Sequence, residues 1–376
     1  MIYKALNESI IQDEDNIGND LEAIENEIFN DEEDNIVEET FMVIYEMEYN
    51  SNVLLKNIGL MQLSEVVNGE DKKENILVRA WKAIKKFFID LWDKVKELWG
   101  KFLDKLGIRN KYYKSFLKEC EEKEKEIDNA DTKLLPAPEK IKINEGYFKD
   151  YIGRLNSSVV DVYLQDQEIN EDIEHLKRLI KMAKKGRSLK TDYEEDDNKE
   201  RIYYLKRVID FKSGSELEKE IENLNITAIG KLLKDKILSV KGNEIEIELT
   251  NENIKKYKEA AKENLLAEDD FIKSLKKEIR EANVCYESII KSFNEIEPEL
   301  QSLNVDKNDQ AHIINFAKRL QWEMKSFSYL SSIALSTATS EFEAARFQSK
   351  KLLEHIFKYT YNEEKSTNES FFLFAN

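Results

Sequence analysis

The chain has 376 residues, of which 36 % are charged, and it contains only 11 glycines and 3 prolines. This composition favours long helices over a fold rich in tight turns, and the length allows about two to three domains. The net charge of −18 argues against binding nucleic acid through a general basic surface.

The negative charge is concentrated near the N-terminus. Residues 5–55 contain 16 Asp or Glu and no Lys or Arg, whereas residues 56–376 contain 60 acidic and 57 basic residues. We expect residues 1–34 to form an acidic, flexible arm that either contacts a basic partner surface or keeps the chain soluble. A long helix over 35–66 should then open a helical domain that spans residues 35–130.

The most informative stretch is residues 76–106, which we predict to be one amphipathic helix that ends at Gly107. Its large apolar side chains recur at the helical period, and lysines border them. Such a helix either seals a protein core or groove, or lies in a membrane interface with its lysine ammonium groups in water. The residues that we expect to dock on a partner or a membrane are Trp81, Ile84, Phe88, Leu91, Trp92, Val95, Trp99 and Phe102.

The middle of the chain is predicted to hold a linker, a second helical domain and one small β-hairpin. Two of the three prolines lie in the stretch that we assign as the linker. The sequence leaves residues 201–211 open between helix and strand. The predicted elements are the linker 131–146, a helix over 147–184, a loop over 186–200, the hairpin near 237–249, a helix over 251–266 that is capped by Thr250 or Asn251, and a helix over 268–295 that stops near Pro298.

The second helical domain, residues 147–361, should end in a long helix over 309–360. The middle of this helix is rich in Ser, Ala and Thr, which lets two helix backbones approach closely and predicts a tight helix–helix contact. The tail 362–376 ends in adjacent large apolar residues that we expect to dock on the body or on a neighbour. These tail residues are Phe371, Phe372, Leu373 and Phe374.

The sequence contains none of the common catalytic or ligand-binding motifs that we searched for. No HExxH, CxxC, GxGxxG, GxxxxGK[ST] or GxSxG pattern occurs. Asp172 and His175 lie three residues apart, but we interpret them as surface residues, and Asp306 with its neighbours as a helix cap. Cys120 and Cys285 should be reduced, structural thiols. We therefore expect no enzyme, no metal and no cofactor.

One resemblance concerns the first third of the chain. The opening MIYKALNES, the acidic arm, the segment EETFMVIYEMEYNSNVLLKNIGLMQL and the segment AWKAIKKFFIDLWDKVKELWGKFLDKLG together resemble virion structural proteins of large tailed bacteriophages of low-GC hosts. The resemblance covers about residues 35–107. It implies a head-associated or internal component of the particle and carries over no catalytic or ligand residues.

Together these features predict a mainly α protein with long amphipathic helices in a bundle-like or elongated arrangement. We expect a non-enzymatic structural or assembly protein that binds other protein subunits or copies of itself, in a virion or inside the host cell. No signal peptide or transmembrane span is expected. The alternatives are a peripheral membrane-binding protein that uses helix 76–106, for example in genome delivery, and a regulatory protein that binds host proteins.

Overall fold

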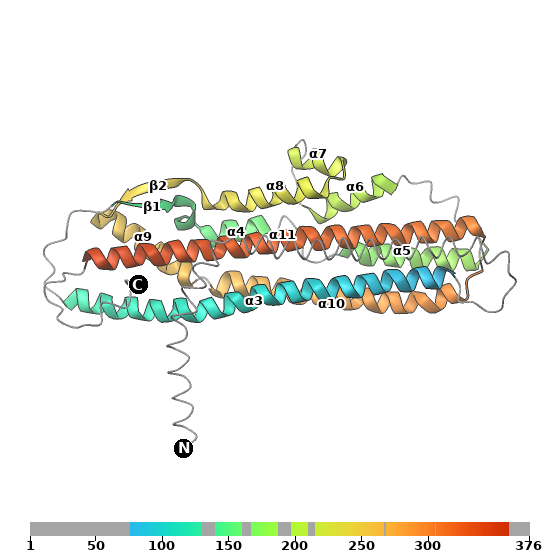
Figure 1. Cartoon of the computed structure of the whole chain (residues 1–376), viewed down its shortest axis with the longest axis horizontal. Helices are drawn as coiled ribbons and strands as arrows, with labels where there is room; N and C mark the ends of the chain where they lie inside the picture. Colours follow the sequence, from blue (N-terminus) through green and yellow to red (C-terminus); the bar gives the residue numbers. More distant parts are fainter. Residues whose placement is uncertain are drawn as a thin grey trace, which may run out of the picture.

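Three long helices run along the molecule and give it an elongated shape (Figure 1). The computed structural model describes residues 76–129, 140–159, 167–186, 197–209, 215–266, 268–304 and 306–360. Two of the long helices have 54 residues each, which corresponds to about 80 Å at a rise of about 1.5 Å per residue. The long helices are α3 (Ile76–Asn129), α10 (Glu268–Gln301) and α11 (Lys307–Thr360). The predicted mainly α fold is thus confirmed.

Shorter elements surround α11, which packs against α3, α4, α5, α6, α8 and α9. The remaining helices are α4 (Tyr151–Val159), α5 (Gln167–Lys184), α6 (Asp197–Val208), α7 (Glu216–Glu222), α8 (Ile226–Leu238) and α9 (Asn251–Leu266). Residues 201–208, which the sequence left undecided, therefore belong to a helix. The predicted arm 1–34, the helix over 35–66 and the tail 362–376 lie outside the described residues.

Helix α3 does not end at Gly107, as the sequence predicted, but continues to Asn129. Gly107 is exposed, and a Cβ atom built there would meet nothing within 4 Å. The next turns of the helix carry buried side chains, including Tyr113 and Phe116. Packing of these turns therefore overrides the weak local signal of a single glycine.

The predicted hairpin over 237–249 is also wrong. Only its second half forms a strand, β2 (Glu244–Glu248), which pairs antiparallel with β1 (Lys140–Asn144). The first half belongs to α8 and to a 3₁₀ turn, η3 (Ser239–Lys241). Because β1 lies inside the segment assigned as a linker, part of that linker is structured.

The helix predicted over 147–184 is broken in the structure. A 3₁₀ turn, η1 (Glu145–Phe148), precedes α4, and Asp150 between them has a φ of 46°. Helix α10, in contrast, runs past Pro298, where the sequence predicted a stop. Ile296 and Leu300 on either side of this proline are fully buried, so packing holds the last turn in place.

The hydrophobic core is continuous across the two predicted helical domains. Helix α3, from the first, packs against α10 and α11, from the second. The described parts of both domains therefore share one core and form one elongated bundle.

Candidate functional site

The predicted docking surface of helix 76–106 is covered by the chain itself. All eight docking residues are at most 3 % exposed. The Trp81 Nε1–H donates a hydrogen bond of 3.0 Å to the carbonyl oxygen of Phe293 on α10, and the rings of Trp92 and Tyr286 stack with centroids 3.5 Å apart. Because α10 occupies this face, the helix seals the core of its own chain in this structure, which is one of the alternatives that the sequence left open.

The small-residue stretch of α11 forms a close helix–helix contact in the described structure. Ser328, Ser331 and Ala334 are fully buried. On the facing helix α8, a Cβ atom at Gly230 would lie 2.8 Å from Cδ1 of Ile333 and 3.0 Å from Cε1 of Tyr329. Only glycine fits this approach without a shift of its neighbours. The small residue at this contact is Gly230 of α8, which the sequence analysis did not single out, and α11 contributes the large side chains of Tyr329 and Ile333.

A buried group of charged side chains, here called the Arg346 cluster, joins α11 to the second half of α3. It consists of Arg109, Asn110, Tyr113, Glu343 and Arg346, all at most 6 % exposed. Arg346 donates to Asn110 Oδ1 at 2.9 Å and lies 3.4 Å from Glu343, which also faces Arg109 at 3.8 Å. The guanidinium of Arg346 sits 4.1 Å from the centroid of the Tyr113 ring. Charge pairing and a cation–π contact thus offset the cost of burying these groups.

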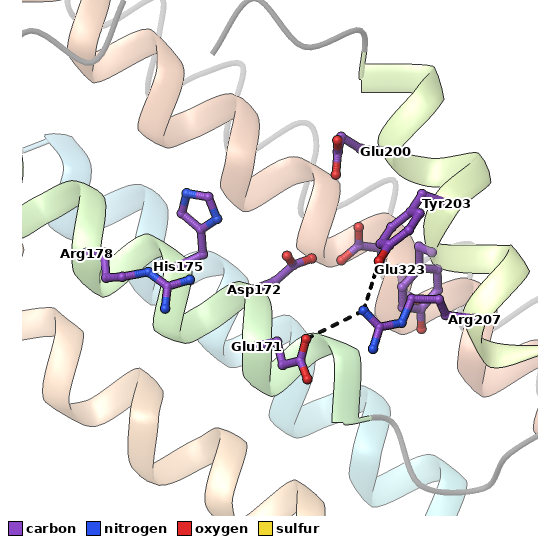
Figure 2. Close-up of a pocket in the computed structure, with 9 residues that line it drawn as sticks. Glu171, Asp172, His175, Arg178, Glu200, Tyr203, Arg207 and Glu323 are labelled. Atoms are coloured by element: carbon purple, nitrogen blue, oxygen red, sulfur yellow. Dashed lines mark hydrogen bonds and ion pairs between the residues drawn. The ribbon is translucent and has the colours of Figure 1, made fainter. Parts of the chain in front are cut away.

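A cavity lined by charged side chains lies between α5, α6 and α11 and has a volume of about 240 Å³ (Figure 2). We call it the charged pocket. Tyr203 and Arg207 are exposed and form the rim of the pocket, whereas Tyr204 and Glu323 are buried and form its floor. The lining residues are Glu171, Asp172, His175, Arg178, Glu200, Tyr203, Tyr204, Arg207 and Glu323.

Three of the carboxylates that line the pocket, each from a different helix, face one buried guanidinium. Arg319 of α11 is 6 % exposed and lies 3.8 Å from Asp172 of α5, 3.8 Å from Glu200 of α6 and 3.5 Å from Glu323 of α11. Figure 2 shows these three carboxylates converging from the three helices. Arg319 therefore ties α5 and α6 to the central helix.

At the rim, a second arginine is held by the wall of the pocket. Arg207 donates to the Tyr203 hydroxyl at 3.0 Å and lies 3.7 Å from Glu171, as the dashed lines in Figure 2 mark. Its guanidinium also lies 5.5 Å from the centroid of the Tyr203 ring. The pocket thus already places two of the chain's own guanidinium groups against carboxylates.

The sequence singled out only two of these residues, Asp172 and His175, and assigned them to the surface. The structure places both, half-buried, in the pocket wall. Glu200 and Glu323 were missed because they come from helices distant in sequence. A usable signal was the pair Arg319 and Glu323, two charged residues one helical turn apart on a long helix with a continuous apolar face.

The other chemical predictions concern the N-terminus of α11 and the cysteines. Asp306 Oδ1 accepts hydrogen bonds of 2.9 Å from the backbone N–H groups of Asn308 and Asp309, so Asp306 caps this helix as predicted. Cys120 and Cys285 are free thiols. Burial raises the pKa of Cys120 to about 12, which keeps this thiol protonated at neutral pH.

Within the described ranges, no three His, Cys, Asp or Glu side chains come together in a way that could hold a metal ion. None of the helices described there combines the length and apolar character that membrane crossing requires. The fold defined by these observations is an elongated helical bundle that carries the charged pocket on α5, α6 and α11. No protein family, no characterised protein and no solved structure matches the chain.

Proposed function

We propose that this protein is a structural or assembly component that acts through protein–protein contacts, within the particle of a tailed bacteriophage. The observation that carries the proposal is the rod built by α3, α10 and α11, which share one continuous core along their length. Such a body suits a spacer or scaffold, because its long helices hold distant surfaces at a fixed separation. The phage setting rests on the sequence resemblance alone.

The eight apolar residues of α3 from Trp81 to Phe102, here called the α3 stripe, are buried inside the chain. Contacts with other proteins are therefore expected elsewhere on the molecule. Large apolar side chains that are exposed in the described residues are few and scattered, namely Tyr203, Leu266 and Val284. We therefore assign partner binding to segments outside the described bundle. The acidic stretch 5–55 can meet a basic surface, and Phe371, Phe372, Leu373 and Phe374 can meet an apolar one.

The membrane-binding alternative ranks lower because it needs the α3 stripe to leave the core. The bundle would have to separate α3 from α10 before Trp81 or Trp92 could reach lipid. Each large side chain that leaves the core forfeits about 1.5–3 kcal/mol unless lipid replaces its cover. Flotation with anionic vesicles tests this directly, and flotation of the folded full chain would reverse the ranking.

The decisive test of the structural role is mass spectrometry of purified mature and precursor particles of the phage that encodes the chain. Stoichiometric copies in either particle are expected, and absence from both would refute the proposal. A deletion of residues 370–376 should reduce incorporation into particles. The matched control replaces Thr367, Asn368 and Ser370 with alanine, which leaves the apolar residues in place and should not alter incorporation.

A further inference from the structure

We propose that the outward side of α10 between Lys273 and Lys291, here called the α10 face, binds the acidic stretch over residues 21–34 of the same chain. The inference goes beyond the structural role proposed above and does not depend on it. It rests on the charge of the α10 face, on an exposed valine within it and on the length of chain that joins the two segments.

The α10 face lies opposite the buried side of the helix. Ile279, Tyr286 and Phe293 recur at the helical period and are buried, and Tyr286 and Phe293 contact aromatic rings of α3. The residues on the other side of α10 therefore point away from the bundle. Its exposed charged and apolar residues are Lys273, Lys276, Lys277, Arg280, Val284, Glu287 and Lys291.

The α10 face carries an excess of positive charge. Five of its residues are Lys or Arg and one is Glu, and the flanking Glu278 and Glu281 still leave two positive charges in excess. Lys277 lies 3.9 Å from Glu281 and is 71 % exposed, so this ion pair is loose and wet. On neighbouring α3, by contrast, ion pairs within the helix balance lysines such as Lys101, which lies 3.1 Å from Glu97.

Acidic residues bound the α10 face at both ends. Residues 268–270 are Glu, Asp and Asp, and Glu295 beyond the other end lies 2.8 Å from Lys177 of α5. The basic segment between these ends is about 27 Å long at a rise of about 1.5 Å per residue. An acidic peptide of about ten to twenty residues matches this length.

The acidic stretch 21–34 matches the α10 face in charge and in apolar content. It contains seven Asp or Glu and no Lys or Arg. Leu21, Ile24, Ile28 and Phe29 also lie within it. Val284, which is 61 % exposed among basic side chains, offers such residues an apolar contact beside the charges.

The connection between the two segments allows them to meet within one chain. The rings of Phe88 and Trp92 lie against Tyr286, so the α10 face is about 18–24 Å along α3 from the start of that helix at Ile76. Residues 35–75 join the acidic stretch to Ile76 and can extend over about 135 Å at about 3.3 Å per residue. Because a tethered ligand has a high effective concentration, the chain's own acidic stretch outcompetes that of a second copy. A basic partner of this stretch then has to displace it from α10.

Zero-length carbodiimide cross-linking of the full chain tests the contact, because it joins a carboxyl group to a lysine amine only where the two touch. We expect residues 21–34 to be linked to Lys276, Lys277 or Lys291, and the yield to fall in about 0.5 M salt. A mixture of unlabelled and ¹⁵N-labelled chains separates the two possible sources. Links within one isotopic species support the proposal, whereas hybrid links would assign the α10 face to a second copy and overturn it.

A charge-reversal variant locates the binding. Lys276→Glu/Arg280→Glu should reduce the links from residues 21–34 to Lys277 and Lys291 about tenfold, because two attractive charges become repulsive. The matched control, Lys219→Glu/Lys231→Glu, makes the same change of charge on α7 and α8. These helices lie on the other side of α11 from α10, so the links should not change (Figure 1).

A second variant leaves the bundle untouched. Glu22→Gln/Glu25→Gln/Glu27→Gln lowers the charge of the acidic stretch only, and should reduce the links from Asp31 and Asp34 to the α10 face. Thermal melts confirm that each variant is folded, and this second variant decides the question if Lys276→Glu/Arg280→Glu melts at a lower temperature. Links spread evenly over the lysines of all helices, or yields that neither variant changes, would refute the site.

Discussion

The two halves of α3 meet the rest of the bundle in different ways. Its first half, residues 77–102, buries aromatic and aliphatic side chains against α10, where Phe88 stacks on Tyr286 with ring centroids 5.2 Å apart. Its second half faces α11 with charges, where Arg109 and Asn110 meet Glu343 and Arg346. One continuous helix thus contains an apolar interface and a polar interface.

The two interfaces have different effects on the fold. The apolar interface supplies stability, and the polar interface fixes the alignment of α3 along α11. Apolar burial supplies most of the folding free energy, but it is not directional, so many similar packings gain nearly as much. The Arg346 cluster gains little net free energy because its charges lose their hydration. It is satisfied only when Arg346 reaches both Asn110 and Glu343, however, so we infer that it fixes how α3 lies along α11.

The largest effect is expected in the apolar half. Phe88→Ala removes a fully buried ring that contacts Tyr286 and Phe293, and should lower the free energy of unfolding by about 3–5 kcal/mol. Urea denaturation followed by circular dichroism measures the change. Tyr203→Ala, an aromatic truncation at an exposed site, is the control and should cost far less. A small effect of Phe88→Ala would mean that α10 does not cover this face.

The polar half should respond differently to single and double substitutions. Arg346→Met removes a cation that lies 3.4 Å from the buried Glu343 and should cost about 2–3 kcal/mol. The double variant Arg346→Met/Glu343→Leu removes the buried charge as well and should recover most of that loss. The same urea titrations measure both, and additive losses would show that the two charges act independently.

The buried carboxyl of Glu341 on α11, two residues before Glu343, predicts that the stability of the protein depends on pH. Burial raises the pKa of Glu341, while the hydrogen bond donated by Tyr147 at 2.9 Å opposes the rise. The folded state therefore holds this proton more tightly than the unfolded state. The resulting stability is fully present below the unfolded pKa, near 4.5, and is lost as the pH rises through the folded pKa.

Glu341→Gln mimics the protonated form and should stabilise the protein by about 1 kcal/mol at pH 7. The difference from the unmodified chain should vanish near pH 4, where Glu341 itself is protonated. Thermal melts at a series of pH values measure this. A constant difference across the series would place the cause in packing and not in the charge.

Much of the helical framework could be predicted from the sequence, because periodic apolar residues are a local signal. For example, Phe316, Leu320 and Phe327 of α11 recur at the helical period, and all three are buried. The strand pairing was missed because its partners are far apart in the chain. Its signal was nevertheless present, since KIKIN and EIEIE alternate in step and place Lys140 3.0 Å from Glu246 and Lys142 3.3 Å from Glu244.

The charged pocket could not be predicted in the same way. Asp172, Glu200 and Glu323 converge only because α5 and α6 both pack on α11. The pattern of each helix shows which face is buried, but not which charged residues of other helices lie opposite it. The convergence of side chains depends on tertiary packing, so the sequence singled out only Asp172 and His175 of α5 and assigned both to the surface.

The smallest predicted effect tests the connection between the two halves of α3. Gly107 lies between them, and a Cβ atom there has open space. In the interior of a helix, Gly107→Ala should stabilise the protein by about 0.5–1 kcal/mol, because alanine loses less backbone entropy on folding. If Gly107 instead capped the helix in the left-handed conformation, as the sequence suggested, alanine would destabilise the protein.

Gly100→Ala, also without a close neighbour, is the matched control, and it should be stabilising in either case. If Gly100→Ala stabilised the protein and Gly107→Ala destabilised it, α3 would consist of two helices that meet at Gly107. The comparison between two halves of one continuous helix would then be wrong.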